Sequence, residues 1–580
     1  MPSLAPRRER SGAIEAATAA EDTKAKPMST EQRALLATVL ALVIFVAWGF
    51  LFPQQPSEPP QRERLATGPE APKAPAPRPT AGPAAVSPLK GAAVSSRLPE
   101  REVIVDTDLI RAVLTTRGAT LKSWELKRYT ADDGKPVDLV AQTEGPWAPL
   151  LAWSGKLEEA APIDFEADRG RLDLRSPSER GTVTFRSRAA GPLRLTKRFT
   201  FSGDIYKVEM QLVWENEGKK PIGILPEIAW GPGLHGDRRS SRSQLQSPTT
   251  LVDGRRVTDD LEKLQAPSTH SGAVSWIALY DQYFAAALLP QGEAVVATVR
   301  KDPHGQPLIA LAAPAQTLQP RAEAVSRFAV YAGPKVLDRL KAVGPDLDSI
   351  VDLGWFDFLA RPALELLRFL YRFTGNYGLA IILVTILQKV LFHPLTIKSL
   401  RSMQAMQALQ PKIAAVQERY KNNPQRKQQE MMELYKKHGV NPMGGCLPML
   451  LQIPIFIALY NALSNSVEMW RARFLWIKDL SQPDALFTID VWGLKDYPFN
   501  LLSILMGVTM FVQQKQAPVA GDPRQAKLML YLMPTMFTFM FWTFPSGLVL
   551  YWLVNNILQI GQQYWLERRG KLSQRGAEKT

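Results

Sequence analysis

The chain has 580 residues, 46% of them hydrophobic, and a formal net charge of +15. This length exceeds one domain and predicts at least two folded units with linkers. Its single cysteine, Cys446, excludes an internal disulfide framework and a cysteine-based zinc cluster, and its five histidines show no metal-ligand spacing. We therefore expect no metal site. Each Gly-Lys pair lacks the Ser or Thr of a phosphate-binding loop, which disfavours an ATP-driven motor.

The first apolar run covers residues 34–52 and carries no charge. At about 1.5 Å per residue it spans one hydrocarbon core. It predicts transmembrane helix 1 after a cytoplasmic tail at residues 1–33. A cleavable signal peptide is the alternative, but the run ends without a small-residue cleavage site. Because Met28 lies just before the run, the sequence leaves the translation start open between Met1 and Met28.

Residues 53–100 are rich in proline and alanine, a composition that stays extended and predicts a linker. Region 101–345 then changes to short alternating segments separated by Gly, Pro and Asp. These segments are residues 102–106, 119–126, 193–200, 205–214, 294–300 and 325–331. Without helices between them, they predict a large antiparallel β-sandwich. Its acids lie among Arg and Ser as on a solvated surface, so we expect a binding or scaffolding domain without catalytic residues.

Residues 355–374 predict an amphipathic helix in the membrane interface. Arg361, Glu365, Arg368 and Arg372 recur at spacings of four, three and four residues, and apolar side chains fill the rest. Four charges on one face argue against spanning the bilayer and for a position in the headgroup plane. The alternative is an ordinary amphipathic helix that packs on the sandwich.

Five further apolar segments predict transmembrane helices 2 to 6. They are residues 377–394, 446–463, 499–513, 528–544 and 548–566. The predicted connections are a cytoplasmic hairpin at 395–443, an outer loop at 464–498, a cytoplasmic loop at 514–527 and a basic tail at 567–580. Cytoplasmic loops retain basic residues, and residues 398–438 hold nine of them against three acids. Both termini are therefore expected inside and the sandwich outside.

Ionisable and amide side chains in the predicted spans are the candidate functional residues. Lys389 lies in the second span, where a charge at the bilayer centre costs about 2.5–3.5 kcal/mol on insertion scales. It either faces protein and water or snorkels to the interface. Amides occur in four spans, and the last helix places Trp552, Asn556 and Gln559 on one face. Together with Gln388 and Gln452, these amides favour a hydrated groove for the polar part of a translocating chain.

Between the second and third spans, apolar residues recur at spacings of three and four on both sides of a break at Asn422-Asn423-Pro424. This pattern predicts an antiparallel helical hairpin, in which Pro411 kinks or interrupts the first arm. We expect the hairpin to bind a ribosome, a targeting factor or a nascent chain, with a solvated connector as the alternative. The named contact residues are Met403, Met406, Tyr420, Arg426 and Lys427. The basic charge here and in the tail attracts anionic lipid and ribosomal RNA.

Several long stretches carry a resemblance to a known family. They are MQALQPKIAAVQERY, QQEMMELYKKHGVNPMGGCLPMLLQIPIFIALYNAL, ILMGVTMFVQQK and FPSGLVLYWLVNN. They resemble the membrane core of the YidC/Oxa/Alb insertases, and TRGATLKSWEL more loosely resembles the periplasmic domain of Gram-negative members. The resemblance covers about residues 355–569. It implies a six-transmembrane α-helical bundle, made of a five-helix insertase core plus an N-terminal anchor, with a periplasmic antiparallel β-supersandwich, in the bacterial inner membrane.

The resemblance also implies a function. Such proteins insert, fold and help assemble nascent membrane proteins, alone or with the Sec translocon, without a cofactor. By this likeness Lys389 takes the place of the groove's positive residue, Thr385 a position near the substrate, and Trp552 a position where relatives often carry tyrosine. A small-solute transporter would instead show an internal repeat, and a sugar enzyme on the sandwich would need paired carboxylates. A structural assembly factor is the third alternative.

Overall fold

The computed structural model describes residues 99–577, apart from positions 132, 141–147, 155–162, 189–190, 236–245, 294–295, 440–446, 492–493 and 517–522. The expected cytoplasmic tail at 1–33, transmembrane helix 1 at 34–52 and nearly all of the linker at 53–100 lie outside the described residues.

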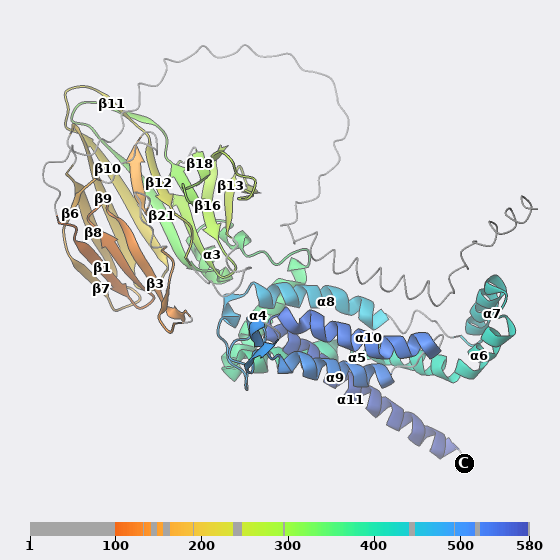
Figure 1. Cartoon of the computed structure of the whole chain (residues 1–580). Coiled ribbons are helices and arrows are strands. Elements are labelled where there is room, and N and C mark those ends of the chain that lie inside the picture. Colours follow the sequence, from red (N-terminus) through yellow and green to blue (C-terminus); the bar gives the residue numbers. More distant parts are fainter. Residues whose placement is uncertain are drawn as a thin grey trace, which may run out of the picture. The chain divides into compact units, whose positions relative to one another are not determined.

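The first described region consists of β-strands (Figure 1). In chain order they are β1 Glu102–Thr107, β2 Ile110–Thr115, β3 Thr120–Thr130, β4 Pro136–Asp138, β5 Leu151–Ser154, β6 Phe165–Ala167, β7 Arg171–Leu174, β8 Arg180–Ser187, β9 Leu193–Ser202, β10 Lys207–Asn216 and β11 Ile222–Ile224. They continue with β12 Pro226–Trp230, β13 Ser247–Val252, β14 Arg255–Thr258, β15 Ser268–Ser271, β16 Val274–Tyr280, β17 Phe284–Pro290, β18 Val296–Lys301, β19 Pro307–Ala312, β20 Gln316–Leu318 and β21 Glu323–Pro334.

These strands form layered sheets, as the alternating sequence pattern predicts. A nine-stranded sheet has the order β14-β13-β16-β17-β21-β10-β9-β8-β6, and two five-stranded sheets have the orders β4-β3-β2-β1-β7 and β15-β18-β19-β12-β5. In β9, buried and more exposed side chains alternate because successive residues point to opposite faces. Register follows the same pattern: Met210 of β10 lies opposite Phe199 of β9 and Phe328 of β21. The inward faces of these strands make the core.

One strand pair departs from the predicted antiparallel arrangement. β1 and β7 are parallel, with Val105 opposite Leu172. The strand before β7 is β6, which belongs to the nine-stranded sheet, so the chain crosses between sheets before it returns beside β1. A crossover removes the constraint that makes hairpin-connected strands antiparallel, and local sequence patterns do not reveal it.

A fully buried lysine lies inside this core. The Lys197 ammonium donates hydrogen bonds to the carbonyl oxygens of Gly118 at 2.6 Å, Leu150 at 3.1 Å and Ala119 at 3.2 Å. Ala119 and Leu150 have φ values of 46° and 66°, so the lysine joins two turns in the left-handed region. Burial lowers the pKa of Lys197 to about 7, because removal from water penalises the charged form.

The second described region is helical. Its elements are α3 Leu337–Val343, η2 Leu347–Ile350, α4 Asp357–Thr374, α5 Tyr377–Ala408, α6 Gln410–Arg419, α7 Pro424–Lys437, α8 Leu447–Ser464, η4 Val467–Met469, α9 Leu501–Gln516, α10 Pro523–Met540, η5 Phe541–Thr543 and α11 Ser546–Ala577, with a hairpin of β22 Thr488–Val491 and β23 Leu494–Pro498. Pro394 lies inside α5, so this helix continues past the predicted end of the second span. The first interruption comes at Leu409, just before Pro411 in the first turn of α6.

The helices pack as a bundle in which α11 lies against α9 and α5, α10 against α9, and α8 against α4 (Figure 1). Within the described residues, one helix is long and apolar enough to cross a membrane, Tyr377–Met406, and shorter apolar helices lie at Leu451–Ser464 and Leu528–Thr543. The predicted count of six spans therefore stays a prediction.

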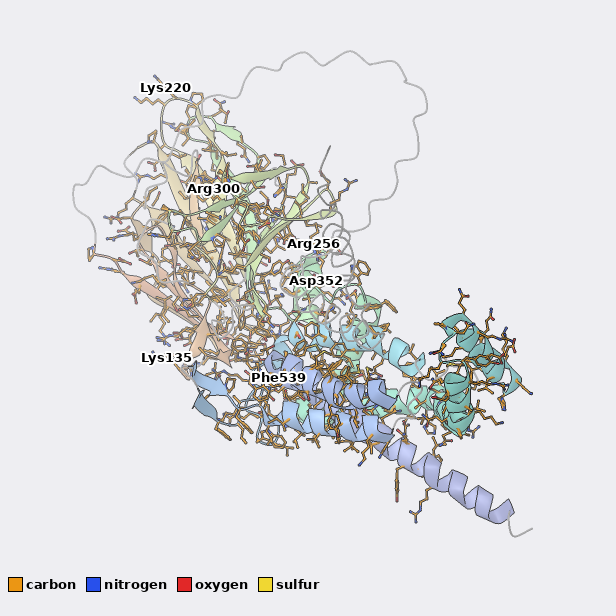
Figure 2. The ribbon with its side chains drawn as sticks, turned by 45° about the vertical axis from the view of Figure 1, so that its right-hand side comes forward. Lys135, Lys220, Arg256, Arg300, Asp352 and Phe539 are labelled. Carbon is orange, nitrogen blue, oxygen red and sulfur yellow. The ribbon has the colours of Figure 1, made fainter. Side chains whose placement is uncertain are left out.

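Large exposed apolar side chains mark the helical region. Every such side chain among the described residues lies at Trp355 or beyond, and Leu391 and Phe539 are 71% and 68% exposed (Figure 2). The described part of the sandwich shows none. A surface of this kind is unfavourable in water and indicates contact with lipid or with other apolar partners.

Two of the four charges of α4, Arg361 and Arg368, form ion pairs. Glu365 and Arg372 are exposed, and the position of the helix in the membrane interface stays a prediction. Arg361 contacts Asp357 and Asp348, with its nearest nitrogens at 2.7 and 3.0 Å from their carboxylate oxygens. Arg368 pairs with Glu468 of the following outer loop, 2.7 Å from Nε to Oε1. The helix also exposes aromatic rings, including Phe373 at 74%. Asp357 lies in α4 itself, four residues before Arg361, whereas Asp348 and Glu468 come from other segments that helical periodicity does not reveal.

Candidate functional site

The ammonium of Lys389 points into the helix bundle. It extends from α5 and its Nζ donates a hydrogen bond to Oε1 of Gln559 on α11, at 2.8 Å. In the snorkelling alternative, the Lys389 ammonium extends away from the protein to the membrane–water interface. The hydrogen bond to Gln559 opposes that orientation. Because the acceptor is a neutral amide, the bond satisfies one donor without neutralising the positive charge, and no carboxylate among the described residues pairs with this ammonium.

Further amides on α11 reach the neighbouring helices. Asn556 donates to Oγ1 of Thr509 on α9 at 3.3 Å, and Gln563 donates to the Gln516 carbonyl at 2.7 Å. Asn556, Gln559 and Gln563 recur at spacings of three and four and so share a helix face. This face of α11 is therefore polar from Asn556 to Gln563.

A second polar cluster joins three helices. Gln452 on α8 donates to the hydroxyl of Tyr551 on α11, and Gln388 on α5 also interacts with that hydroxyl. Tyr551 is 1% exposed. The sequence patterns singled out its neighbour Trp552 instead, because one residue along a helix turns the side chain by about 100° and only packing decides which one faces the amides.

Two predicted groove residues lie apart from these polar clusters. Thr385 is fully buried, and its hydroxyl donates to the Ile381 carbonyl one turn earlier at 2.7 Å. Trp552 packs among phenylalanine rings, 5.0 Å from Phe456 between ring centroids. The structure thus brings Lys389 together with Gln559, and Gln388 with Gln452, but it assigns neither Thr385 nor Trp552 to the polar contacts.

Several buried amide oxygens in the bundle have no hydrogen-bond partner among the described residues. They are Oε1 of Gln388, Gln516 and Gln562 and Oδ1 of Asn555. Leaving such a group unpaired costs about 1–3 kcal/mol, and polar cavities normally hold water that pairs it. These four oxygens lie on α5, α9 and α11, the helices that also carry Lys389, Thr509 and Gln559.

The helical hairpin of α6 and α7 has its own small core of Met406, Leu409, Ile413 and Tyr435. Met406 is therefore not an accessible contact residue, contrary to its assignment from the sequence, because it closes the hairpin on itself. Tyr420 donates to Glu430 at 3.2 Å, and Arg426 lies over the Tyr420 ring. Lys427 is partly exposed, and the Met403 side chain lies outside the described parts of the chain.

The loop after α8 ties together the helix ends on the opposite side of the bundle from the hairpin. Ser546 at the start of α11 donates its backbone N–H to the Gln482 carbonyl at 2.7 Å and its hydroxyl to the Asp479 carbonyl at 2.8 Å. Asp484 accepts from the backbone N–H of Leu502 in the first turn of α9 at 2.9 Å. We name residues 465–484, which belong to the predicted outer loop, the outer cap. It holds α9 and α11 at their first turns.

Two family models match the chain in adjoining stretches. The model described as 60Kd inner membrane protein matches residues 369–574, and the model described as YidC periplasmic domain matches residues 102–366. The first stretch covers the helices from α5 to α11 and the second covers the strands from β1 to β21. The fold and these matches define an inner-membrane protein that carries a periplasmic β-sheet domain.

Curated relatives extend this match over nearly the whole chain. The membrane protein insertase YidC of Syntrophus aciditrophicus is 38% identical over 557 residues, which is 93% of this chain and 100% of the relative. That of Geobacter metallireducens is 37% identical over 547 residues, 93% of this chain and 98% of the relative. A structure titled active YidC insertase with the first transmembrane domain resolved covers 92% of this chain and 99% of its own, at 19% identity and a TM-score of 0.36. The chain belongs to the YidC family of membrane protein insertases.

Proposed function

We propose that this insertase accepts the polar segment of its substrate in a hydrated groove beside Lys389. The observation that carries the proposal is the contact of the Lys389 ammonium with Gln559, for which the described residues supply no counter-charge. A partly buried cation without a counter-charge attracts acidic residues, because an opposite charge replaces part of the hydration that the ammonium has lost. Gln388, Gln452 and Tyr551 supply donors and acceptors for the substrate's backbone.

The apolar helix of the substrate enters lipid beside α5. This helix exposes Leu383, Leu387 and Leu391 at intervals of four residues, together with Val390 beside Leu391. Transfer of an apolar helix into lipid supplies the driving force, and the membrane potential adds about 2.3 kcal/mol per acidic charge moved outward at 100 mV. The cycle needs no nucleotide and no covalent step.

The topology and partners follow from charge and from family membership. We propose six spans with both termini in the cytoplasm and the sandwich in the periplasm, because basic residues dominate the hairpin and the tail. Arg426 and Lys427 of the hairpin and the basic end of α11 would contact ribosomes, targeting factors or anionic lipid. Cooperation with the Sec translocon is part of the same proposal.

Complementation tests the groove. A cell depleted of its native insertase receives the intact chain, Lys389→Ala or Lys389→Arg, and protease protection reports insertion of a short membrane protein with an acidic outer segment. We expect the intact chain and Lys389→Arg to insert it, and Lys389→Ala to lose most insertion. Lys398→Ala is the matched control, since it removes an exposed lysine from the same helix. Normal insertion by Lys389→Ala would refute the charged-groove mechanism.

A further inference from the structure

A histidine lies one turn beyond Lys389 on the same helix. His393 comes four residues after Lys389 on α5, which at about 1.5 Å per residue places it roughly 6 Å further along the helix. Residues four apart share a helix face, so the imidazole and the ammonium lie on the same side of α5. In the proposed topology this direction leads toward the cytoplasm. His393 therefore lies at the inner mouth of the proposed groove.

The contact of His393 repeats the contact of Lys389. Nδ1 of His393 lies 3.1 Å from Nε2 of Gln562 on α11. Gln562 comes three residues after Gln559, the hydrogen-bond partner of Lys389. Two successive contacts thus connect α5 with α11, and each joins one basic side chain to one glutamine.

Two glutamine side chains at this level have a buried oxygen without a hydrogen-bond partner among the described residues. They are Gln562 and Gln516 of α9, each through its Oε1. The backbone carbonyl of Gln516 accepts from Gln563, so α9 and α11 are in contact here. A buried acceptor without a donor is unfavourable, and the backbone N–H groups of an entering polypeptide are donors that would pair with these oxygens. The two oxygens therefore point to a polypeptide ligand.

The glutamine partner allows His393 to carry a charge. In the neutral ring, Nδ1 accepts from the amide NH2 of Gln562, and in the protonated ring, Nδ1–H donates to Oε1 of the same amide after it rotates. Protonation therefore loses no hydrogen bond. His438 of the hairpin differs, because its ring nitrogens lie 2.9 Å from the Lys412 ammonium and 2.9 Å from the Leu434 carbonyl. A second proton on that ring would face a cation.

Most charged groups near His393 are basic. α8, which packs on α5, has no charged residue. On α6 the acid Glu418 lies 3.4 Å from the Lys421 ammonium, and on α11 the acid Glu567 comes five residues after Gln562. Within the described part of the chain, no carboxylate pairs with His393. Basic groups on α5, α6, α9 and α11 include Lys389, Lys398, Lys412, Lys515 and Arg568. A protonated His393 therefore adds to a positive field that attracts carboxylates.

We propose that His393 is a second cation of the groove, which recognises acidic polypeptide segments at the inner mouth and strengthens this recognition as the pH falls. This inference rests on the proposed function, because it adds a residue to the same groove. Histidine is the side chain that gains its charge near neutral pH. A substrate carboxylate meets His393 first and Lys389 one turn later, while the unpaired amide oxygens accept from the backbone of the substrate. The two cations thus select substrates by the acid content of the translocated segment.

Insertion into inverted inner-membrane vesicles at two pH values tests this role. The vesicles come from cells that are depleted of their native insertase and carry the full chain, so the cytoplasmic side faces the bath. Protease protection measures the initial rate for a short membrane protein with an acidic outer segment, and for the same protein with each acid replaced by its amide. From pH 8 to pH 6, across the titration of an ordinary histidine, we expect the acidic substrate to insert about fivefold faster, as for a partly exposed ion pair. The amide substrate should keep its rate.

Substitutions at His393 separate its charge from its place in the structure. His393→Gln should insert the acidic substrate at the slower rate at both pH values, and His393→Lys at the faster rate at both. An unchanged rate for the amide substrate shows that each variant is folded. His438→Gln is the matched control, since it removes the histidine of the hairpin and should keep the pH response. A full pH response in His393→Gln, or no gain by His393→Lys at the higher pH, would overturn the proposal.

The two proposals fail separately. Normal insertion by Lys389→Ala together with a lost pH response in His393→Gln would remove Lys389 from the mechanism and keep His393. Loss of insertion in Lys389→Ala together with a full pH response in His393→Gln would keep the charged groove and remove His393.

Discussion

Trp470 of the outer cap packs edge-on against Phe284 at the start of β17, with ring centroids 5.2 Å apart and ring planes at 77°. It contacts Tyr283 in the same geometry, at 5.1 Å and 79°, and its Nε1 donates to the Thr130 carbonyl at 3.3 Å. Gln282 adds a hydrogen bond from its side chain to the Ser464 carbonyl at the end of α8. One indole thus joins the sandwich to the loop that fixes the helix ends.

Replacing this indole should loosen the joint. Trp470 is 9% exposed, and Trp→Ala at buried sites costs about 3–5 kcal/mol. We expect Trp470→Ala to speed hydrogen exchange in residues 281–285 and 464–470, measured by mass spectrometry on the full chain. Trp355→Ala, which removes a ring that is 81% exposed, should leave both segments unchanged. Equal exchange in both variants would contradict the role of Trp470.

The buried lysine predicts a pH dependence of sandwich stability. Burial places the folded pKa of Lys197 at about 7, against 10.5 in the unfolded chain. Between these values the unfolded chain binds more protons, so stability rises with pH across the window and is lost as pH falls toward 7. The slope should approach about 1 kcal/mol per pH unit. Lys335, whose pKa burial lowers to about 8, adds a slope of the same sign.

Hydrogen exchange of β3 and β9 between pH 7 and pH 9, corrected for intrinsic rates, measures this slope. Lys197→Met should flatten the dependence of stability on pH, since methionine does not titrate. The variant also loses the three hydrogen bonds of the ammonium, which changes stability by the same amount at every pH and so does not affect the slope. An unchanged slope in Lys197→Met would show that other groups carry the pH dependence.

Tyr551 should matter through its hydroxyl. Tyr551→Phe keeps the ring but leaves the amides of Gln452 and Gln388 without that partner, at a cost of about 1–3 kcal/mol for each buried group left unpaired. We expect lower thermal stability in detergent and reduced insertion of the acidic test substrate. Tyr564→Phe, on the same helix and 61% exposed, is the matched control. If both variants behave alike, the hydroxyl of Tyr551 has no role in the groove.

The ion pair between α4 and the outer cap should be energetically coupled. Arg368 and Glu468 have side chains that are 15% and 11% exposed, so solvent screens them weakly. We expect Arg368→Gln and Glu468→Gln each to destabilise the chain, and the double variant to cost less than their sum. A double-mutant cycle in thermal or chemical unfolding should give a coupling of about 1–3 kcal/mol. Additive effects would mean that the pair contributes nothing beyond its separate residues.

Local sequence patterns determined the elements whose signal repeats over a few residues. The alternation at residues 193–200 and 205–214 corresponds to β9 and β10, because a strand's side-chain period is two wherever one face is buried. The spacing at 355–374 corresponds to α4, and Pro411 lies at the start of a new helix. Long sequence motifs also indicated the insertase family before any contact was known.

Only the tertiary structure decided which side chains meet. It paired Lys389 with Gln559, placed Tyr551 rather than Trp552 among the amides, and buried Lys197 beneath two turns. These contacts join residues that lie about 50 to 170 positions apart, as the hydrogen bonds at Lys197, Gln452 and Lys389 show. A helical period tells which residues share a face, but the rotation of each helix against its neighbours depends on the packing of the whole bundle. The sequence therefore named the residue types of the groove, and packing selected their partners.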